Sequence, residues 1–448
     1  MLPRRIISML DRRVVITGVS VVSALGIGKE EYISALFKNI SGIERIKAFD
    51  PTGFPSQVAG ESPHIKMSKV VPKSHRKATK LMSRDIELAV TAADSAVRDA
   101  QLNTRGINPE EPIDIEPTRC GVNIGAGLIC CNLEELAAAV ETATDNNHFS
   151  LRKWGSEGMN RLTPLWLLKY LPNMLSCHIS IIHDLQGCSN SITCAEASGL
   201  LAIGEAFRSI ARGHTDLMVA GGAESKVTPM GLLRQCLLNR ASTSYNDQPH
   251  QACRPFDRGA DGSVIGEGSG IVILEELEHA RRRGVDIYAE LKGFGASNNF
   301  SDDFVQPEEQ AAGTVQAMKK ALRQAQLSPD QIHLLVPHGV AVPGHDRAEA
   351  GAIKTIFGEY SRELPVFATN SRIGNCGAAS AAIDFATSVL MMKENKVPAN
   401  LNCPDLPEEY GLNLTKSPAI ETEIKHAMTC SYTYGGQTAA LIAGKIED

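Results

Sequence analysis

The sequence lacks an excess of basic residues, long apolar runs and a secretion signal. Its 45 Lys and Arg residues are outnumbered by 51 Asp and Glu residues. This balance argues against a nucleic-acid-binding protein, because such proteins carry clustered basic charge. No run of 18 apolar residues occurs, and the opening residues MLPRRIISMLDRR lack the apolar stretch and cleavage site of a signal peptide. We therefore expect a cytoplasmic protein without a membrane span.

Motifs for metal and nucleotide binding are also missing. The 11 cysteines are odd in number, irregularly spaced and contain no CxxC pair, which disfavours a disulfide framework and a zinc site. No GxGxxG with its following acidic residue and no GxxxxGK[ST] is present, which disfavours nucleotide phosphates as ligands. We expect neither a bound metal nor a bound cofactor.

Short apolar segments alternate with longer helical patterns along the 448 residues. The length predicts about two domains, and continuous apolar strands are typical of sheets covered by helices on both faces. The predicted strands are 14–17, 121–124, 217–220, 271–274, 287–291, 332–336, 366–369 and 439–443. The predicted helices include 197–212, 310–326, 347–357 and 377–393. The pattern indicates a layered α/β fold with a faint internal duplication.

Several longer strings then become recognisable in a fixed order. They are LMVAGGAE at 217–224, RPFDRGADGSVIGEG at 254–268, IVILEELEHA at 271–280, PHGVAVPGHDRAE at 337–349 and SYTYGG at 431–436. Together they resemble the β-ketoacyl-acyl-carrier-protein synthases, over nearly the whole chain from Arg12 to Ile446. The resemblance implies a thiolase-like fold of two similar α/β halves in α-β-α-β-α layers, at 12–284 and 285–448, usually assembled as a dimer.

The resemblance also locates the reaction centre. Family members carry a nucleophilic cysteine in a TACxxG turn at the start of a buried helix, where the helix dipole favours the thiolate. Matching Gly187 and Gly199 without gaps places Glu196 at the nucleophile position. Cys194 lies two residues earlier, and its use as the nucleophile would require a two-residue insertion. Alternatively, Cys194 is a small apolar residue that packs in the α/β core.

The remaining family positions are only partly retained. His338 matches the histidine of the HGTxxxxxDxxE string. Asn370 and Asn375 replace the lysine and the histidine of the second catalytic string. The loop that gates the acyl pocket and supplies an oxyanion-hole N–H matches Tyr432, Tyr434 and Gly435.

These replacements leave several functions open. Acyl transfer to Glu196 would give a mixed anhydride that water destroys, so ordinary condensation is disfavoured. We expect a non-condensing subunit like the chain-length factors, in which Glu196 makes a structural contact with His338 or another donor. One alternative is a malonyl-carrier decarboxylase using His338, with Asn375 as a weaker donor. A second is a condensing enzyme that uses Cys194.

The resemblance further implies partners. The expected substrate is carried on the phosphopantetheine of an acyl carrier protein, and the chain would form a homodimer or pair with an active synthase. The spacing of the basic residues between 73 and 84 predicts that they share one helix face, which suits an acidic carrier. The docking residues are Arg76, Lys77, Lys80 and Arg84, with Lys73 beside them.

The segment 133–158 makes the chain about a dozen residues longer than the family pattern. Its polar stretch ETATDNNH at 141–148 predicts a surface loop near the dimer interface or the mouth of the acyl tunnel.

Overall fold

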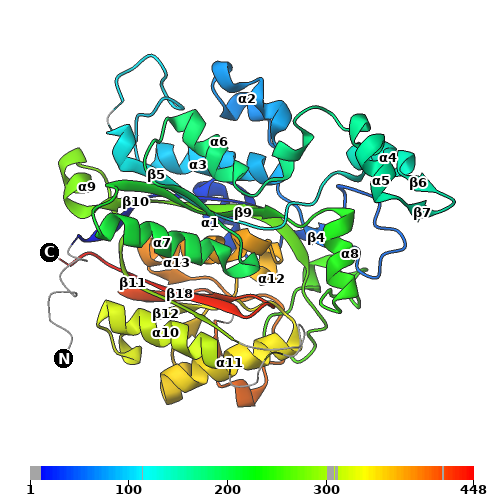
Figure 1. Ribbon diagram of the computed structural model, residues 1–448. Coiled ribbons are helices and arrows are strands. Elements are labelled where there is room, and N and C mark those ends of the chain that lie inside the picture. Colours follow the sequence, from blue (N-terminus) through cyan, green and yellow to red (C-terminus); the bar gives the residue numbers. More distant parts are fainter. Residues whose placement is uncertain (1–11, 114, 300–306, 308–310, 416–417, 448) are drawn as a thin grey trace, which may run out of the picture.

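The computed structural model describes residues 12–113, 115–299, 307, 311–415 and 418–447 (Figure 1). The principal strands are β1 Val14–Ser23, β5 Cys120–Ala126, β8 Ser189–Ile192, β9 Leu217–Ser225, β10 Ile265–Glu276, β11 Ala289–Asn298, β12 Leu334–Val336, β13 Pro365–Val366, β17 His426–Tyr432 and β18 Gln437–Gly444. Shorter strands are β2 Gly26–Ile27, β3 Ile43–Arg45, β4 Val58–Gly60, β6 Thr144–Asp145, β7 His148–Phe149, β14 Lys396–Val397, β15 Asn413–Leu414 and β16 Ile420–Glu421. The helices are α1 Lys29–Phe37, α2 Met67–Val70, α3 Arg84–Asp99, α4 Leu133–Thr142, α5 Leu151–Ser156, α6 Met174–His183, α7 Ser198–Ala211, α8 Pro229–Leu237, α9 Leu277–Arg283, α10 Ala312–Ala325, α11 Pro343–Phe357, α12 Asn370–Ile373 and α13 Ser380–Glu394.

One strand order occurs twice. The first half runs β8-β5-β9-β10-β1 and the second β13-β12-β17-β18-β11. In the first half β5 is parallel to its neighbours β8 and β9, while β10 is antiparallel to β9 and β1. In the second half β12 is likewise parallel to β13 and β17, while β18 is antiparallel to β17 and β11. The first strand of each half also shifts register near its start, after Ile16 and after Leu291. The predicted duplication is confirmed.

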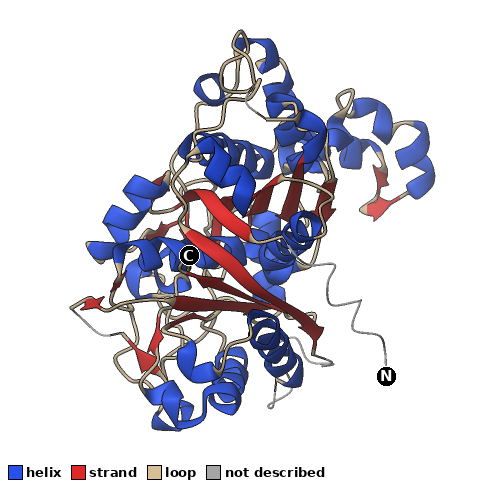
Figure 2. Ribbon diagram, turned by 90° about the vertical axis from the view of Figure 1, so that its left-hand side faces the viewer, coloured by secondary structure: helices blue, strands red, loops and turns tan. Residues whose placement is uncertain are grey.

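The layers follow from this repeat. Figure 1 shows α3 and α6 above the strands of the first half, α7 and α13 between the two sets of strands, and α10 and α11 below the second. Figure 2 shows helices on the outer faces of the strands from a second direction. The predicted α-β-α-β-α architecture is therefore confirmed. Among the described residues, no helix is long and apolar enough to cross a membrane.

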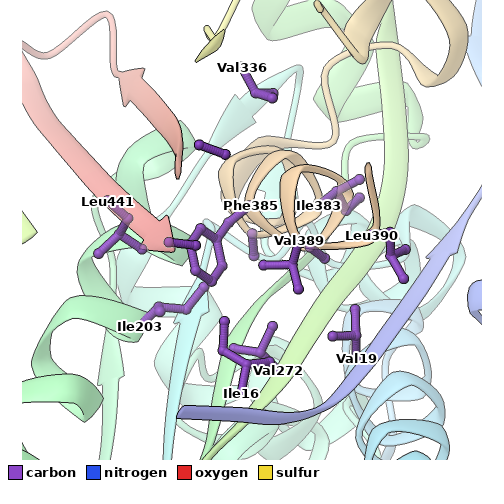
Figure 3. Packing of buried hydrophobic residues seen from close by; sticks show 14 of the residues in the cluster. Ile16, Val19, Ile203, Val272, Val336, Ile383, Phe385, Val389, Leu390 and Leu441 are labelled. Carbon is purple, nitrogen blue, oxygen red and sulfur yellow. The ribbon is translucent and has the colours of Figure 1, made fainter. Parts of the chain in front are cut away.

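The central layer is built from small and apolar side chains. A Cβ atom at Gly199 of α7 would lie 2.8 Å from the backbone nitrogen of Ala382 in α13, so the two helices pack at close range. Around them Phe385 and Val389 of α13 extend toward Ile16 of β1, as Figure 3 shows. All of these side chains are fully buried. The turns before the two helices are held in the same way, since Ser198 Oγ accepts the N–H of Cys194 and Ser380 Oγ accepts that of Cys376.

Each of the eight predicted strands and four predicted helices overlaps an element of the structure, although the predicted strand 366–369 shares only Val366 with β13. Residue 310 of the predicted helix 310–326 lies outside the described residues. Of the principal strands, the patterns missed β8 and β17; β8 has the polar sequence SNSI and no apolar run to mark it. The boundary between 284 and 285 stays a prediction.

The extra segment is not a loop. It contains α4, a short β6–β7 hairpin and α5, and Figures 1 and 2 show it projecting from the body. Asn132 caps α4 by accepting the N–H of Glu134, and Ser150 caps α5 by accepting that of Lys153. These caps and the sequence LEELAAAVET favour helix on either side of a polar turn. We call residues 133–161 the arm.

The prediction of one basic helix face is also wrong. Residues 73–75 and 78–81 form two separate short 3₁₀ turns, and Arg84 begins a new helix. Arg84 is half-buried, and its guanidinium donates to Glu267 at 2.7 Å and to Ser62 Oγ at 2.7 Å. Its charge is thus balanced within the molecule.

Truncation of Phe385 tests the central layer. Phe385→Ala leaves a cavity among fully buried neighbours and should lower the free energy of unfolding by about 3–5 kcal/mol. Urea unfolding measures the change. The matched control is Phe149→Ala, because Phe149 is 51% exposed and its truncation should cost less than about 1 kcal/mol. Equal costs would contradict this account of the core.

Candidate functional site

Glu196 lies in the turn between β8 and α7, within a 3₁₀ turn at Ala195–Ala197. Ala195 adopts a positive φ of 41°, which turns the chain sharply after the strand. Ser198 holds this turn, because its Oγ accepts the N–H of Cys194 and donates to Ala195 O, both at 2.7 Å. The Glu196 side chain consequently lies at the buried start of α7, with no exposed surface.

Two side chains bind the Glu196 carboxylate. Lys226, one residue beyond the end of β9, donates from Nζ to Glu196 Oε1 at 3.0 Å. Asn375 donates from Nδ2 to the same oxygen at 3.2 Å. Lys226 Nζ also lies 3.4 Å from Asn375 Oδ1, so the three side chains contact one another. The hypothesised structural contact of Glu196 is thus made by Lys226 and Asn375.

The contact between Glu196 and Lys226 is an ion pair. Burial raises the pKa of Glu196, but the positive charges of Lys226 and Arg240 and the nearby His338 outweigh it and leave the pKa below its usual value. Burial lowers the pKa of Lys226, but the negative charges of Glu196 and Glu224 outweigh this effect. The pKa of Lys226 therefore lies above its usual value. Both groups are therefore charged at neutral pH. Removing one partner would leave the other charge buried and uncompensated.

His338 follows β12 and is held through its backbone. Its N–H donates to Glu349 Oε1 at 2.9 Å, and Asn370 Nδ2 donates to its carbonyl oxygen at 2.6 Å. Burial lowers the pKa of His338 to about 3, so the imidazole is neutral. Asn370 thus orients the histidine segment and is not among the donors to Glu196.

The gate loop packs around the histidines. Tyr432 is buried, with its ring edge-on to His338 at 5.1 Å between centroids and stacked on His345 at 5.4 Å. The guanidinium of Arg240 lies 5.0 Å from the ring centroid of Tyr434. Gly435 donates its N–H to Thr433 Oγ1 at 3.0 Å, so the predicted oxyanion-hole donor is used inside the turn.

Cys194 has none of the features of an activated thiol. It is half-buried, and burial raises its pKa. Reactive cysteines need the opposite shift, usually from a nearby positive charge. Its backbone N–H caps the turn through Ser198, which fits a structural role.

Sequence reasoning missed Lys226 and Arg240. Lys226 follows a strand of nine consecutive buried residues, and a lysine at such a place signals a buried partner. Arg240 is 1% exposed and lies 2.8 Å from His345 Nε2 through its Nη1. No motif marked Arg240.

The fold defines a member of the thiolase-like class, and its candidate site holds a buried ion pair. Residues 11–280 match the family described as beta-ketoacyl synthase, N-terminal domain, and residues 288–404 match its C-terminal domain. The 3-oxoacyl-[acyl-carrier-protein] synthase 2 of Coxiella burnetii is 33% identical over 440 residues, covering 98% of this chain and all of the relative. The chain belongs to the β-ketoacyl synthase family.

Two solved structures are similar over 97% of this chain and the whole of theirs. The ishigamide ketosynthase/chain length factor is 26% identical with a TM-score of 0.82. A type II polyketide synthase acyl-carrier protein in complex with its ketosynthase gives 26% identity and a TM-score of 0.80.

Breaking the ion pair tests its importance. Lys226→Met leaves the Glu196 carboxylate buried without its cation and should lower the free energy of unfolding by about 3–5 kcal/mol. The double variant Glu196→Gln, Lys226→Met should recover part of this loss. The same change at Lys153, whose side chain is 39% exposed and pairs with Asp145, should cost less than about 1 kcal/mol. Urea unfolding compares the four proteins.

The pH dependence gives a second test. The folded-state pKa of Glu196 is lowered, so its stabilising contribution is present above the unfolded value of about 4.3 and is lost as the pH falls below it. In Lys226→Met, burial without the cation should raise the folded-state pKa of Glu196 above its unfolded value. Ionisation of Glu196 then destabilises the folded variant increasingly as the pH rises. The stability difference between wild type and variant should therefore grow from about pH 4 to 7. A difference that does not change with pH would contradict the assignment.

Proposed function

We propose that this chain is a non-condensing subunit, similar to a chain-length factor, that acts beside an active synthase on acyl chains bound to a carrier protein. The buried ion pair between Glu196 and Lys226 carries the proposal. By the sequence match, the Glu196 carboxylate takes the position of the family's thiol. This carboxylate is buried and paired with a cation. Covalent acyl transfer at this position is chemically unfavourable, because the acyl product would be a mixed anhydride.

A pairing with a second subunit has support at the surface. β8 forms one edge of the sheet, and Ser189 and Asn190 on it are exposed. Open strand edges tend to pair with another chain. The arm also exposes large apolar side chains, since Phe149 is 51%, Leu151 78% and Met159 54% exposed. Exposed apolar groups of this kind are typical of interaction surfaces.

A carrier partner has support from the remaining basic residues. Arg76, Lys77 and Lys80 are exposed, whereas Arg84 is engaged with Glu267. The relative from Coxiella burnetii is named for a carrier-bound substrate, and one similar structure contains an acyl-carrier protein. We propose that Arg76, Lys77 and Lys80 contact an acidic carrier, whose phosphopantetheine presents the acyl chain as substrate.

A malonyl-carrier decarboxylase is the second candidate. The observation in its favour is His338, which is retained and whose Nδ1 has no hydrogen-bond partner among the described residues. A neutral imidazole can donate one hydrogen bond to a developing enolate oxygen. The anionic Glu196 opposes this role, because it would repel the malonyl carboxylate.

Incubation with carrier-bound substrates separates these functions. The purified chain should show no mass increase with acyl-carrier and no carbon dioxide release with malonyl-carrier, yet co-purify with a complete synthase from the same organism and change its product length. Carbon dioxide release that is lost in His338→Ala would favour the decarboxylase. Acylation that is lost in Cys194→Ala would establish a condensing enzyme instead.

The arm gives a test of the pairing. Phe149→Asp with Leu151→Asp places two charges on the exposed apolar surface and should reduce the amount of co-purified synthase by about tenfold. Ile420→Asp is the control, because Ile420 is also an exposed apolar residue, 37% exposed, and lies on β16 outside the arm. Equal recovery with the arm variant and the control would show that the arm does not contact the synthase.

A further inference from the structure

A strip of basic side chains lies on the outside of the first half, on α2 and the short 3₁₀ turns between β4 and α3. Figure 1 shows α2 at the outer edge of the molecule. All of these side chains are exposed, and within the described residues none of them forms an ion pair with a carboxylate. The basic strip consists of Lys66, Lys69, Lys73, Arg76, Lys77 and Lys80. The proposed carrier contact uses only the last three of these cations.

Nearby carboxylates leave the charge of the strip largely unopposed. Glu61 accepts two backbone N–H groups through Oε1, and Glu87 contacts the half-buried Arg84. Glu110 is the one carboxylate among the residues that line a groove beside Lys69. One carboxylate does not balance six cations, so the strip presents a positive potential to the solvent.

Two exposed leucines lie next to the strip. Leu165 is 61% exposed and Leu167 is 58% exposed, at the start of the 3₁₀ turn Trp166–Tyr170. This turn lies beside the 3₁₀ turn Ala78–Leu81, which carries the last lysine of the strip. The surface therefore combines aliphatic side chains with unpaired cations. This combination is typical of proteins that bind at the boundary between lipid headgroups and acyl chains.

We propose that the basic strip and these two leucines bind the surface of an anionic lipid bilayer. The cations attract the phosphate-bearing headgroups, and the leucines enter the boundary between headgroups and acyl chains. Such a contact needs no helix that spans the membrane. A nucleic acid fits this surface less well, because exposed aliphatic side chains add nothing to contacts with a phosphate backbone. The inference goes beyond the proposed function, since neither a carrier nor a synthase takes part in the contact.

Sedimentation of the full chain with lipid vesicles tests this surface. One set of vesicles contains equal parts of phosphatidylcholine and phosphatidylglycerol, and the other contains phosphatidylcholine alone. We expect the chain to bind the anionic vesicles only, and to bind them less tightly as the salt concentration rises. Lys69→Glu with Lys73→Glu should weaken this binding by at least about tenfold, because two attractive charges become repulsive.

The matched control is Lys319→Glu with Arg323→Glu, which changes the net charge by the same amount. Both residues are exposed on α10, which covers the second half on the opposite side of the molecule from α2 (Figure 1). Because the charges are far from the strip and screened by salt, this control should bind within about twofold of the wild type. If the strip variant does not fold, Lys69→Gln with Lys73→Gln decides instead.

The leucines are tested separately by Leu165→Ser with Leu167→Ser. This change should weaken vesicle binding by at least about threefold and leave its salt dependence unchanged, because only apolar contact is lost. The proposal is wrong if both vesicle sets bind equally, if the α10 control loses as much binding as the strip variant, or if the leucine variant binds as the wild type does. Tighter binding of a short DNA duplex than of anionic vesicles would assign the strip to nucleic acid instead.

Discussion

The close contact between α7 and α13 is the constraint on which the candidate site depends. Gly199 leaves room for Ala382, because a side chain at position 199 would collide with the backbone of α13. The same contact brings the start of each helix to one place. Glu196 precedes α7 and Asn375 precedes α13, and their side chains meet at 3.2 Å although they belong to different halves of the fold. The duplicated architecture therefore builds one shared site from two equivalent turns.

Charge balance then decides what this site can do. A buried carboxylate without a cation would be strongly destabilising, and Lys226 supplies that cation from the position that follows β9. The carboxylate and the ammonium are both held in their charged forms, so neither is poised for nucleophilic or acid-base chemistry near neutral pH. His338 stays in place because Glu349 and Asn370 bind its backbone, which requires no catalytic role for the ring. The candidate site is thus held by a buried ion pair and by backbone contacts.

The surface carries two features that fit the proposed pairing with a second subunit. The open edge at β8 and the apolar side chains of the arm lie on segments that the closed reaction centre does not use. The arm is helical because its caps and its alanine-rich sequence favour helix, although its polar turn suggested a loop. The polar composition of 141–148 reflects the exposed turn of the β6–β7 hairpin, whereas the caps at Asn132 and Ser150 favour the helices α4 and α5 on either side.

The sequence by itself determined the class of fold and the family, and it predicted that Glu196 replaces the nucleophile. These depend on local features: apolar runs mark buried strands, and motif order and spacing place Glu196 without gaps between Gly187 and Gly199. Only the tertiary structure decided the partners of the charged residues. Lys226 reaches Glu196, and Glu267 neutralises Arg84, because strand pairing and helix packing bring together residues that no short sequence pattern connects. A charge is visible in the sequence, but whether it is exposed or balanced depends on the residues that the fold places around it.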